Sequence, residues 1–383
     1  MSADIYRRLA SHLDNLPGGF PSTESGVELR ILERLFTPEE AELALHLQLV
    51  PEPARVIARR AGLDPEDTAR RLLEMSRKGL IYRRYRKGEP HYLALQYVIG
   101  IWEFHVNDLD VELIRDMNEY LEQLFEPDLW RRAPQLRTIP ISEDIEVEHG
   151  VLPHENAAEL IRSKKRIAVA PCICRRERRM IGEGCDNPEE ACLVFNSAAD
   201  YYVENEIGRY ITLDEALDLL KVAEENALVL QPGNAVRAAN ICLCCSCCCQ
   251  VLKFMQRHPE PATLAASAFR ARLDPELCTA CGVCVERCPM DALTLPEGAE
   301  AVELDLTRCI GCGNCVTRCP PEAIVLERKP EADQPEVPAT EMRKHLAVAR
   351  ARGKLGTTEI AATALRSGRD RLLSRKARPD SGS

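Results

Sequence analysis

The sequence predicts an α+β protein with three structured parts. The first is a region of short helices followed by a hairpin, the second is a cysteine-rich domain of mixed structure, and the third is built from two similar halves. Three observations lead to this prediction: helix-capping signals in the first hundred residues, ten cysteines between positions 172 and 249, and two cysteine runs of identical spacing after position 277. The length of 383 residues is enough for several domains.

Capping and turn signals place the elements of the N-terminal region. Thr37, followed by Pro-Glu-Glu, forms a capping box with proline at the first helical position. A second short helix closes at Gly62, and a third begins after Asp64 and ends before Gly79. The turn at Gly88-Glu89-Pro90 separates two strand-like runs, which predicts a hairpin.

Three helices followed by a hairpin resemble a winged helix-turn-helix domain over about residues 28–100, with the helix at 65–78 as the recognition helix. Basic side chains of the kind that contact phosphate lie on that helix and on the hairpin: Arg70, Arg71, Arg77, Lys78, Arg83, Arg84, Arg86 and Lys87. The whole chain is acidic, however, with a net charge of −10, and winged helices also serve as protein-docking or scaffold modules. We therefore prefer docking and keep DNA binding as the alternative.

One amphipathic helix and a linker are expected between the N-terminal region and the cysteine-rich domain. Apolar residues recur with helical period over 110–125, and Trp130 is expected to be a packing anchor. The first residues show no apolar signal-peptide core, and no apolar run reaches the ~18 residues of a membrane helix. We therefore expect a cytoplasmic protein whose thiols are reduced.

Ten cysteines occupy the central segment. Cys172 and Cys174 follow a strand-like run, and side chains at i and i+2 of an extended chain share a face. Cys185 and Cys192 come from a loop rich in Gly, Asp, Asn and Pro, which can fold back toward them. After a capped helix that begins at Thr212, six cysteines fall within eight positions: Cys242, Cys244, Cys245, Cys247, Cys248 and Cys249.

Several kinds of site could use these ten thiols. They would suit one iron–sulfur cluster with bystander cysteines, two clusters, or one non-cubane assembly. Zinc also takes four thiolates, adjacent cysteines can form redox-active disulfides, and buried cysteines also pack as hydrophobic residues. His149 and His154, just before this segment, could ligate iron, although surface or capping roles are preferred for both.

Two runs near the C-terminus share the spacing C-x2-C-x2-C-x3-C-P. The first holds Cys278, Cys281, Cys284 and Cys288, and the second holds Cys309, Cys312, Cys315 and Cys319. This spacing is the signature of bacterial two-cluster ferredoxins, in which the fourth cysteine of each run ligates the other cluster. The resemblance covers about residues 271–327 and implies two [4Fe–4S] clusters. One would take Cys278, Cys281, Cys284 and Cys319, and the other Cys309, Cys312, Cys315 and Cys288. A pair of zinc sites is the alternative that we disfavour.

The central pattern "CICR…CDNPEEACLVF…ICLCCSCCC" resembles a group of ferredoxin-like proteins from anaerobic microbes. In that group a cysteine-rich domain precedes a two-cluster ferredoxin module, and here the resemblance covers roughly residues 140–327. It implies iron–sulfur electron transfer but no particular reaction. Because an electron chain gains from another nearby cluster, we favour at least one further iron–sulfur cluster among the ten central cysteines.

The resulting expectation is an α+β chain of six segments. They are an N-terminal segment (1–27), a winged-helix-like domain (28–100), an amphipathic helix and linker (101–140), a cysteine-rich iron–sulfur domain (141–262), a bacterial-type two-[4Fe–4S] ferredoxin domain (271–327), and a linker with a basic tail (328–383).

We expect an iron–sulfur electron-transfer protein, or the electron-transfer subunit of an anaerobic redox complex, that works with redox partner proteins. A redox-sensing DNA-binding regulator and a reductase with catalysis at the central cluster are the alternatives. The chain has no dinucleotide or P-loop motif, and its oligomeric state is left open.

Overall fold

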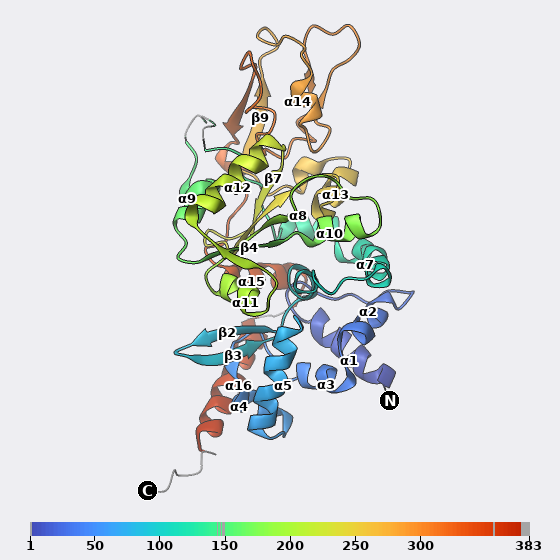
Figure 1. Cartoon of the computed structure of the whole chain (residues 1–383), viewed down its shortest axis with the longest axis vertical. Coiled ribbons are helices and arrows are strands. Elements are labelled where there is room, and N and C mark those ends of the chain that lie inside the picture. Colours follow the sequence, from blue (N-terminus) through green and yellow to red (C-terminus); the bar gives the residue numbers. More distant parts are fainter. Residues whose placement is uncertain (1, 144, 146, 148–149, 355–356, 377–383) are drawn as a thin grey trace. The chain divides into compact units, whose positions relative to one another are not determined.

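The computed structural model describes residues 2–143, 145, 147, 150–354 and 357–376 (Figure 1). The chain divides into two compact units. The first unit combines Met1–Glu126, Glu204–Ile207 and His345–Ser383, and the second combines Pro127–Val203 and Gly208–Lys344. Among the described residues, no helix has both the length and the apolar character that crossing a membrane requires.

The first unit is mainly helical and contains one small antiparallel sheet, in the order β1-β3-β2. Its strands are β1 (Glu52–Pro53), β2 (Tyr82–Arg86) and β3 (Glu89–Leu93), and its described helices are α1 (Ser2–Asp14), α2 (Val27–Leu35), α3 (Pro38–Ala44), α4 (Ala54–Ala61), α5 (Pro65–Arg77), α6 (Trp102–Phe104), α7 (Val111–Leu124) and α16 (Thr357–Lys376). The caps work as the sequence predicts, because the Thr37 side chain accepts from Glu40 N and the Asp64 side chain accepts from two amides of α5.

Helix α16 belongs to the first unit and is held there by a buried polar network. The Ser367 hydroxyl donates to the fully buried Glu52 carboxylate at 2.6 Å. Arg60 of α4 donates to Glu52 at 2.8 Å and to Asp370 at 3.2 Å. Because these side chains are shielded from water, each depends on the others for its hydrogen bonds. The network therefore fixes α16 against α4.

Three histidines of the first unit should make it sensitive to acid. Burial lowers the pKa of His12 and His105, and burial together with nearby arginines lowers the pKa of His46. Each ring is therefore held neutral in the folded state, whereas in the unfolded chain it gains a proton near pH 6.5. The stability that this gives is fully present above pH ~6.5 and is lost as the pH falls below that value toward the depressed folded-state pKa.

We expect amides of α1 and α6 to exchange hydrogen faster at pH 5.5 than at pH 7.5, after correction for the intrinsic exchange rate. A His105→Gln variant should show a smaller difference between the two pH values. Equal corrected protection at both values in the wild-type chain would contradict this prediction.

The second unit is organised around a five-stranded antiparallel sheet in the order β6-β4-β5-β8-β7. Its strands are β4 (Ile167–Pro171), β5 (Glu190–Phe195), β6 (Arg209–Ile211), β7 (Val229–Pro232) and β8 (Asn240–Cys244). The helices of this part are α8 (Pro127–Arg132), α9 (Ala157–Arg162), α10 (Ile173–Met180), α11 (Ser197–Glu204), α12 (Leu213–Glu225) and α13 (Gln250–Arg257). Helix α15 (Glu341–Ala351) begins in the second unit, which ends at Lys344, and continues in the first.

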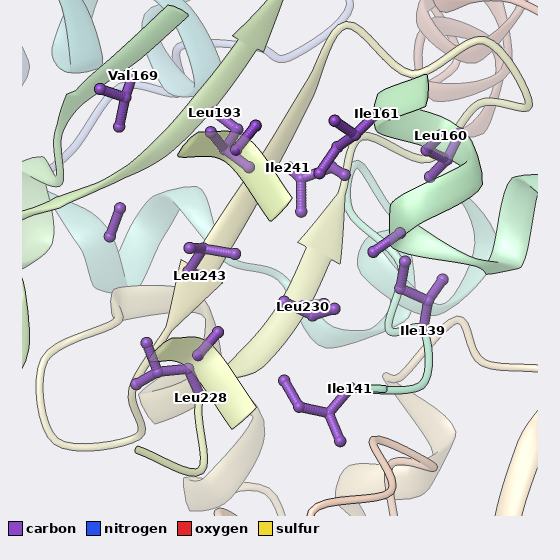
Figure 2. Close-up of a cluster of buried hydrophobic side chains, with 14 of the residues drawn as sticks. Ile139, Ile141, Leu160, Ile161, Val169, Leu193, Leu228, Leu230, Ile241 and Leu243 are labelled. Carbon is purple, nitrogen blue, oxygen red and sulfur yellow. The ribbon is translucent and has the colours of Figure 1, made fainter. Parts of the chain in front are cut away.

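One face of this sheet carries an apolar core (Figure 2). Leu193 lies directly opposite Ile241, and Leu230 lies opposite Leu243. Helix α9 contributes Leu160 and Ile161 to the same cluster, and α12 contributes two buried alanines. Because side chains alternate along a strand, the residues between these leucines point to the other face of the sheet.

The ferredoxin-like module follows this sheet in the same unit. Strand β9 (Phe269–Leu273) pairs with β12 (Ile324–Arg328), and β10 (Leu293–Thr294) pairs with β11 (Glu303–Leu304). A short helix, α14 (Val283–Glu286), lies within the first cysteine run. The module has its own small core of Ala271, Cys284, Leu293, Val302 and Ile324.

Gly311 cannot be replaced without strain, because its φ is +70° and an added Cβ would lie 2.2 Å from the carbonyl oxygen of Phe269. We expect Gly311→Ala to destabilise the second unit by about 2–4 kcal/mol, the sum of a left-handed backbone penalty and overpacking. Gly298 is the matched control, since its φ is +75° but an added Cβ would meet nothing within 4 Å. Thermal unfolding followed by circular dichroism should give a clearly lower midpoint for Gly311→Ala than for Gly298→Ala. Equal midpoints would contradict the prediction.

Candidate metal centres

The cysteines of the ferredoxin module gather into two sets. The outer set lines one cavity and consists of Cys278, Cys281, Cys284 and Cys319. The inner set lines a second cavity and consists of Cys288, Cys309, Cys312 and Cys315. Each set therefore takes three cysteines from one run and its fourth from the other run.

Backbone N–H groups point at two sulfur atoms of the inner set. The amide of Ala292 donates to Cys288 Sγ at 3.2 Å, and the amide of Ala271 donates to Cys309 Sγ at 3.4 Å. Burial raises the pKa of Cys284 to about 11 and that of Cys312 to about 12. These thiols would thus be neutral without a metal and would lose their protons on binding one. Four thiols around each cavity are a donor set that fits a [4Fe–4S] cluster, and in the inner set N–H donors also point at two of the sulfurs.

The inner set is in contact with the rest of the second unit. The amide of Ile141 donates to the carbonyl of Cys312 at 3.0 Å. The side chain of Asn314, which is fully buried, donates to the carbonyl of Ala227 at 2.8 Å. In the outer set, by contrast, Cys281 is exposed. The two sets therefore differ in access: one faces solvent and the other adjoins the central sheet.

Four central cysteines form a compact group, named here the four-thiol site: Cys185, Cys245, Cys247 and Cys248. Their sulfur atoms all lie within 4.8 Å of one another, with 3.8 Å between Cys185 and Cys245 and 3.5 Å between Cys185 and Cys248. Four thiolates bound at ~2.3 Å to one tetrahedral ion lie ~3.8 Å apart. The spacing therefore fits a single metal ion, whereas the thiolates of a cubane lie farther apart because each binds a different iron.

Local structure favours a thiolate at Cys185. Burial opposes its ionisation, but hydrogen bonds from Asn187 and from the neighbouring thiols of Cys247 and Cys248 lower its pKa to about 6. The Asn187 side-chain amide lies 3.5 Å from Cys185 Sγ. The loop that follows α10 supplies Cys185, and the turn that follows β8 supplies the other three thiols.

Arg175, on α10, places a fully buried cation beside these thiols. Its Nε donates to Cys245 Sγ at 3.4 Å, and its two terminal nitrogens donate to the carbonyls of Leu243, at 2.6 Å, and Pro188. Although burial opposes the charge, the thiols of Cys172, Cys245 and Cys244 raise the pKa of Arg175 and keep it protonated. The sequence contained a signal for this residue, the arginine after C-x-C, but its role is visible only in the fold.

The other six central cysteines form a second group, named here the six-thiol site: Cys172, Cys174, Cys192, Cys242, Cys244 and Cys249. The Cys174 thiol contacts Cys172 and Cys249, and the Cys244 thiol contacts Cys249 and Cys242. Cys192 then contacts Cys242, its direct partner across β5 and β8. The ten central cysteines are thus split into two groups.

The pKa shifts of four thiols in the six-thiol site alternate in direction along the contact series. Hydrogen bonds from their thiol neighbours lower the pKa of Cys242 and of Cys249. The pKa of Cys174 and of Cys244 is raised, because hydrogen bonds to neighbouring sulfurs favour the thiol form and because burial opposes the charge. Adjacent sulfur atoms cannot all be thiolates without a cation among them.

The histidines near this region take no part in the four-thiol site. Burial lowers the pKa of His154, and the backbone carbonyl of His154 accepts a hydrogen bond from Arg137. Among the residues that the structure describes, no histidine joins the compact sulfur group. His149 lies outside the described residues.

Several basic side chains of the first unit are engaged within that unit. Arg70 pairs with Asp67 and Glu74, and Lys78 pairs with Glu40. Arg83 is buried and donates to three side chains: Ser76, Glu204 and Asn205. The hairpin residues Arg84, Arg86 and Lys87 are exposed, and Arg71 donates to the backbone carbonyl of Glu39.

Comparison with known proteins identifies one part of the chain. A family model described as a 4Fe-4S dicluster domain matches residues 270–320, which include every cysteine of the inner and outer sets. No curated protein and no solved structure matches the chain. The chain therefore contains a 4Fe-4S dicluster ferredoxin domain at residues 270–320, preceded by a cysteine cluster between residues 185 and 249.

Proposed function

We propose that the protein is a cytoplasmic iron–sulfur electron-transfer protein, or the electron-transfer subunit of an anaerobic oxidoreductase complex. The observation that carries this proposal is the grouping of eight cysteines of the matched dicluster domain around two cavities, four thiols to each. Thiolates in such sets hold [4Fe–4S] clusters, which exchange single electrons when bound. The outer set would hold one cluster, the inner set would hold the other, and the central cysteines would hold a further centre.

The difference in access between the two sets supports a direction for the electron path. Cys281 of the outer set is exposed, as are the nearby apolar side chains of Leu277 and Leu295. A redox partner protein could approach the outer set there. The inner set adjoins the central sheet through Ile141 and Asn314. Electrons would therefore pass from the inner set to the central cysteines.

We further propose that residues 28–100 are a winged-helix-like module for protein docking. Helices α3, α4 and α5 followed by the β2–β3 hairpin support this assignment. DNA binding is the less favoured role, because Arg70, Lys78 and Arg83 already have acidic or polar partners within the first unit. Arginines that are held in this way are less available to phosphate.

Anaerobic redox titration of the full chain tests the proposed function. Reductant should bleach the visible charge-transfer absorption of the purified protein and take up about one electron per [4Fe–4S] cluster. The matched control is the double variant Cys281→Ala, Cys312→Ala, which removes one ligand from each set and should lose the part of this absorption change that comes from the two ferredoxin clusters. A wild-type chain that shows no bleaching on reduction would overturn the proposed function.

A further inference from the structure

The sheet of the second unit has one leucine face and one cysteine face. Leu193 and Leu243 point into the apolar core (Figure 2). The alternating positions Cys192, Cys242 and Cys244 therefore lie on the opposite face. Strand pairing places Cys192 directly across from Cys242, so the register of β5 and β8 makes these two thiols neighbours.

Three more thiols of the six-thiol site come from the starts of helices. Cys172 is the N-cap of α10 and Cys174 lies in the first turn of that helix, while Cys249 is the N-cap of α13. The two thiols in the middle of the contact series, Cys244 and Cys249, are also well buried, with exposed fractions of 5% and 6%. The six-thiol site therefore combines the start of α10, the paired strands β5 and β8, and the start of α13.

The order of contacts has a simple geometrical meaning. One tetrahedral metal ion takes four thiolates, so six thiols in contact are too many for one ion. The contacts form an open series in the order Cys172, Cys174, Cys249, Cys244, Cys242 and Cys192. Among the described residues, no three of these sulfurs form a group that lies within 4.8 Å, unlike the four-thiol site. Sulfurs that are spread in this way fit a centre with several metal ions, in which different thiolates bind different ions.

A buried amide next to the site supplies an independent observation. Gln231 is fully buried and lies directly across β7 and β8 from Cys242. Its Oε1 lies 3.9 Å from Cys249 Sγ, while its Nε2 has no hydrogen-bond partner within the described part of the chain. Asn240 directs its own side-chain amide at Cys242 Sγ, at 3.6 Å. Buried polar groups are normally satisfied, so an unpaired N–H beside six sulfurs points to an acceptor that belongs to the site.

We propose that the six-thiol site holds one polynuclear iron–sulfur centre, separate from the four-thiol site. The choice of iron rests on the proposed function, whereas the presence of more than one metal ion rests on the number of thiols and on the spread of their sulfurs. Each metal–sulfur bond forms as a thiol gives up its proton to solvent. Gln231 Nε2 donates to a sulfur of the centre and so gains the partner that it lacks.

Metal analysis of anaerobically purified full-length chains tests this proposal with three variants. The wild-type chain should contain iron in excess of the about eight atoms of the ferredoxin domain. Cys249→Ser removes the thiolate that connects Cys174 with Cys244 in the contact series and should lose most of that excess. Cys192→Ser removes an end thiolate and should keep part of it. Cys247→Ser is the matched control from the same turn as Cys249, but it belongs to the four-thiol site. It should keep the excess iron of the six-thiol site and lose one metal ion.

Electron paramagnetic resonance on the same samples separates folding from metal loss, because the two ferredoxin signals should persist in all three variants. Mössbauer spectroscopy of the wild-type chain provides a check that needs no substitution, and it should show a spectral component beyond the two [4Fe–4S] clusters. Three results would overturn the proposal: no excess iron while both ferredoxin signals are intact, zinc in the six-thiol site, or equal iron in Cys249→Ser and Cys247→Ser. Absence of the ferredoxin signals from the wild-type chain would instead contradict the proposed function.

Discussion

Cys288→Ala should cost the chain about four irons and one of its two reduced-cluster resonance signals, although Cys288 belongs to the first cysteine run. In the structure its thiol lines the same cavity as Cys309, Cys312 and Cys315 of the second run. Cys288 Sγ also accepts the amide of Ala292, so its direction is fixed by the backbone. Loss of this thiolate therefore leaves the inner set with three ligands and opens the fourth iron to solvent.

The test compares signals between single variants. The signal that disappears in Cys288→Ala should be the one that disappears in Cys312→Ala. The signal lost in Cys319→Ala should match the one lost in Cys281→Ala, because Cys319 and Cys281 line the outer cavity. If Cys288→Ala removed the same signal as Cys281→Ala, each run would bind its own cluster and the crossed ligand sets would be wrong.

Arg175→Met should lower the free energy of local unfolding around β8 by about 3–5 kcal/mol and abolish metal binding at the four-thiol site. Methionine has a similar length, but it leaves the buried carbonyl of Leu243 and the partly buried carbonyl of Pro188 without their donor. It also removes the only positive charge that the structure places against Cys245 Sγ among the described residues. Four thiolates around a divalent ion carry a net negative charge, so the loss of a buried cation weakens their hold on metal.

Native-state hydrogen exchange of β8 amides under anaerobic conditions measures this loss directly. Arg209→Met is the matched control, because Arg209 is an exposed arginine of the same sheet that pairs with Glu190 and Glu215. Exposed ion pairs contribute about 0–1 kcal/mol, so this control should change little. A similar small change in both variants would show that Arg175 has no structural role at the thiols.

Local signals in the sequence were sufficient for several elements. The boxes at Thr37 and Thr212 start α3 and α12, because capping involves only a residue and its neighbour three positions on. The C-x2-C-x2-C-x3-C-P runs indicate the dicluster domain for a similar reason, since most of each ligand set is fixed by spacing within one loop.

The division of the ten central cysteines could not be predicted, because it depends on contacts far apart in the chain. Adjacent residues fall into different groups: Cys244 faces the six-thiol site, whereas Cys245 joins Cys185 in the four-thiol site. The strand register that pairs Cys192 with Cys242 decides this arrangement, and the sequence pattern alone does not specify it. The association of α16 with α4 through Asp370 and Arg60 is a long-range contact of the same kind.

Determination of iron, acid-labile sulfide and zinc in anaerobically purified protein tests the central claim most directly. The claim is that the inner, outer and six-thiol sets hold iron so that the chain can carry electrons. It predicts a coloured protein with more than about eight irons per chain and a comparable amount of sulfide. Colourless protein that contains zinc in place of iron would contradict it.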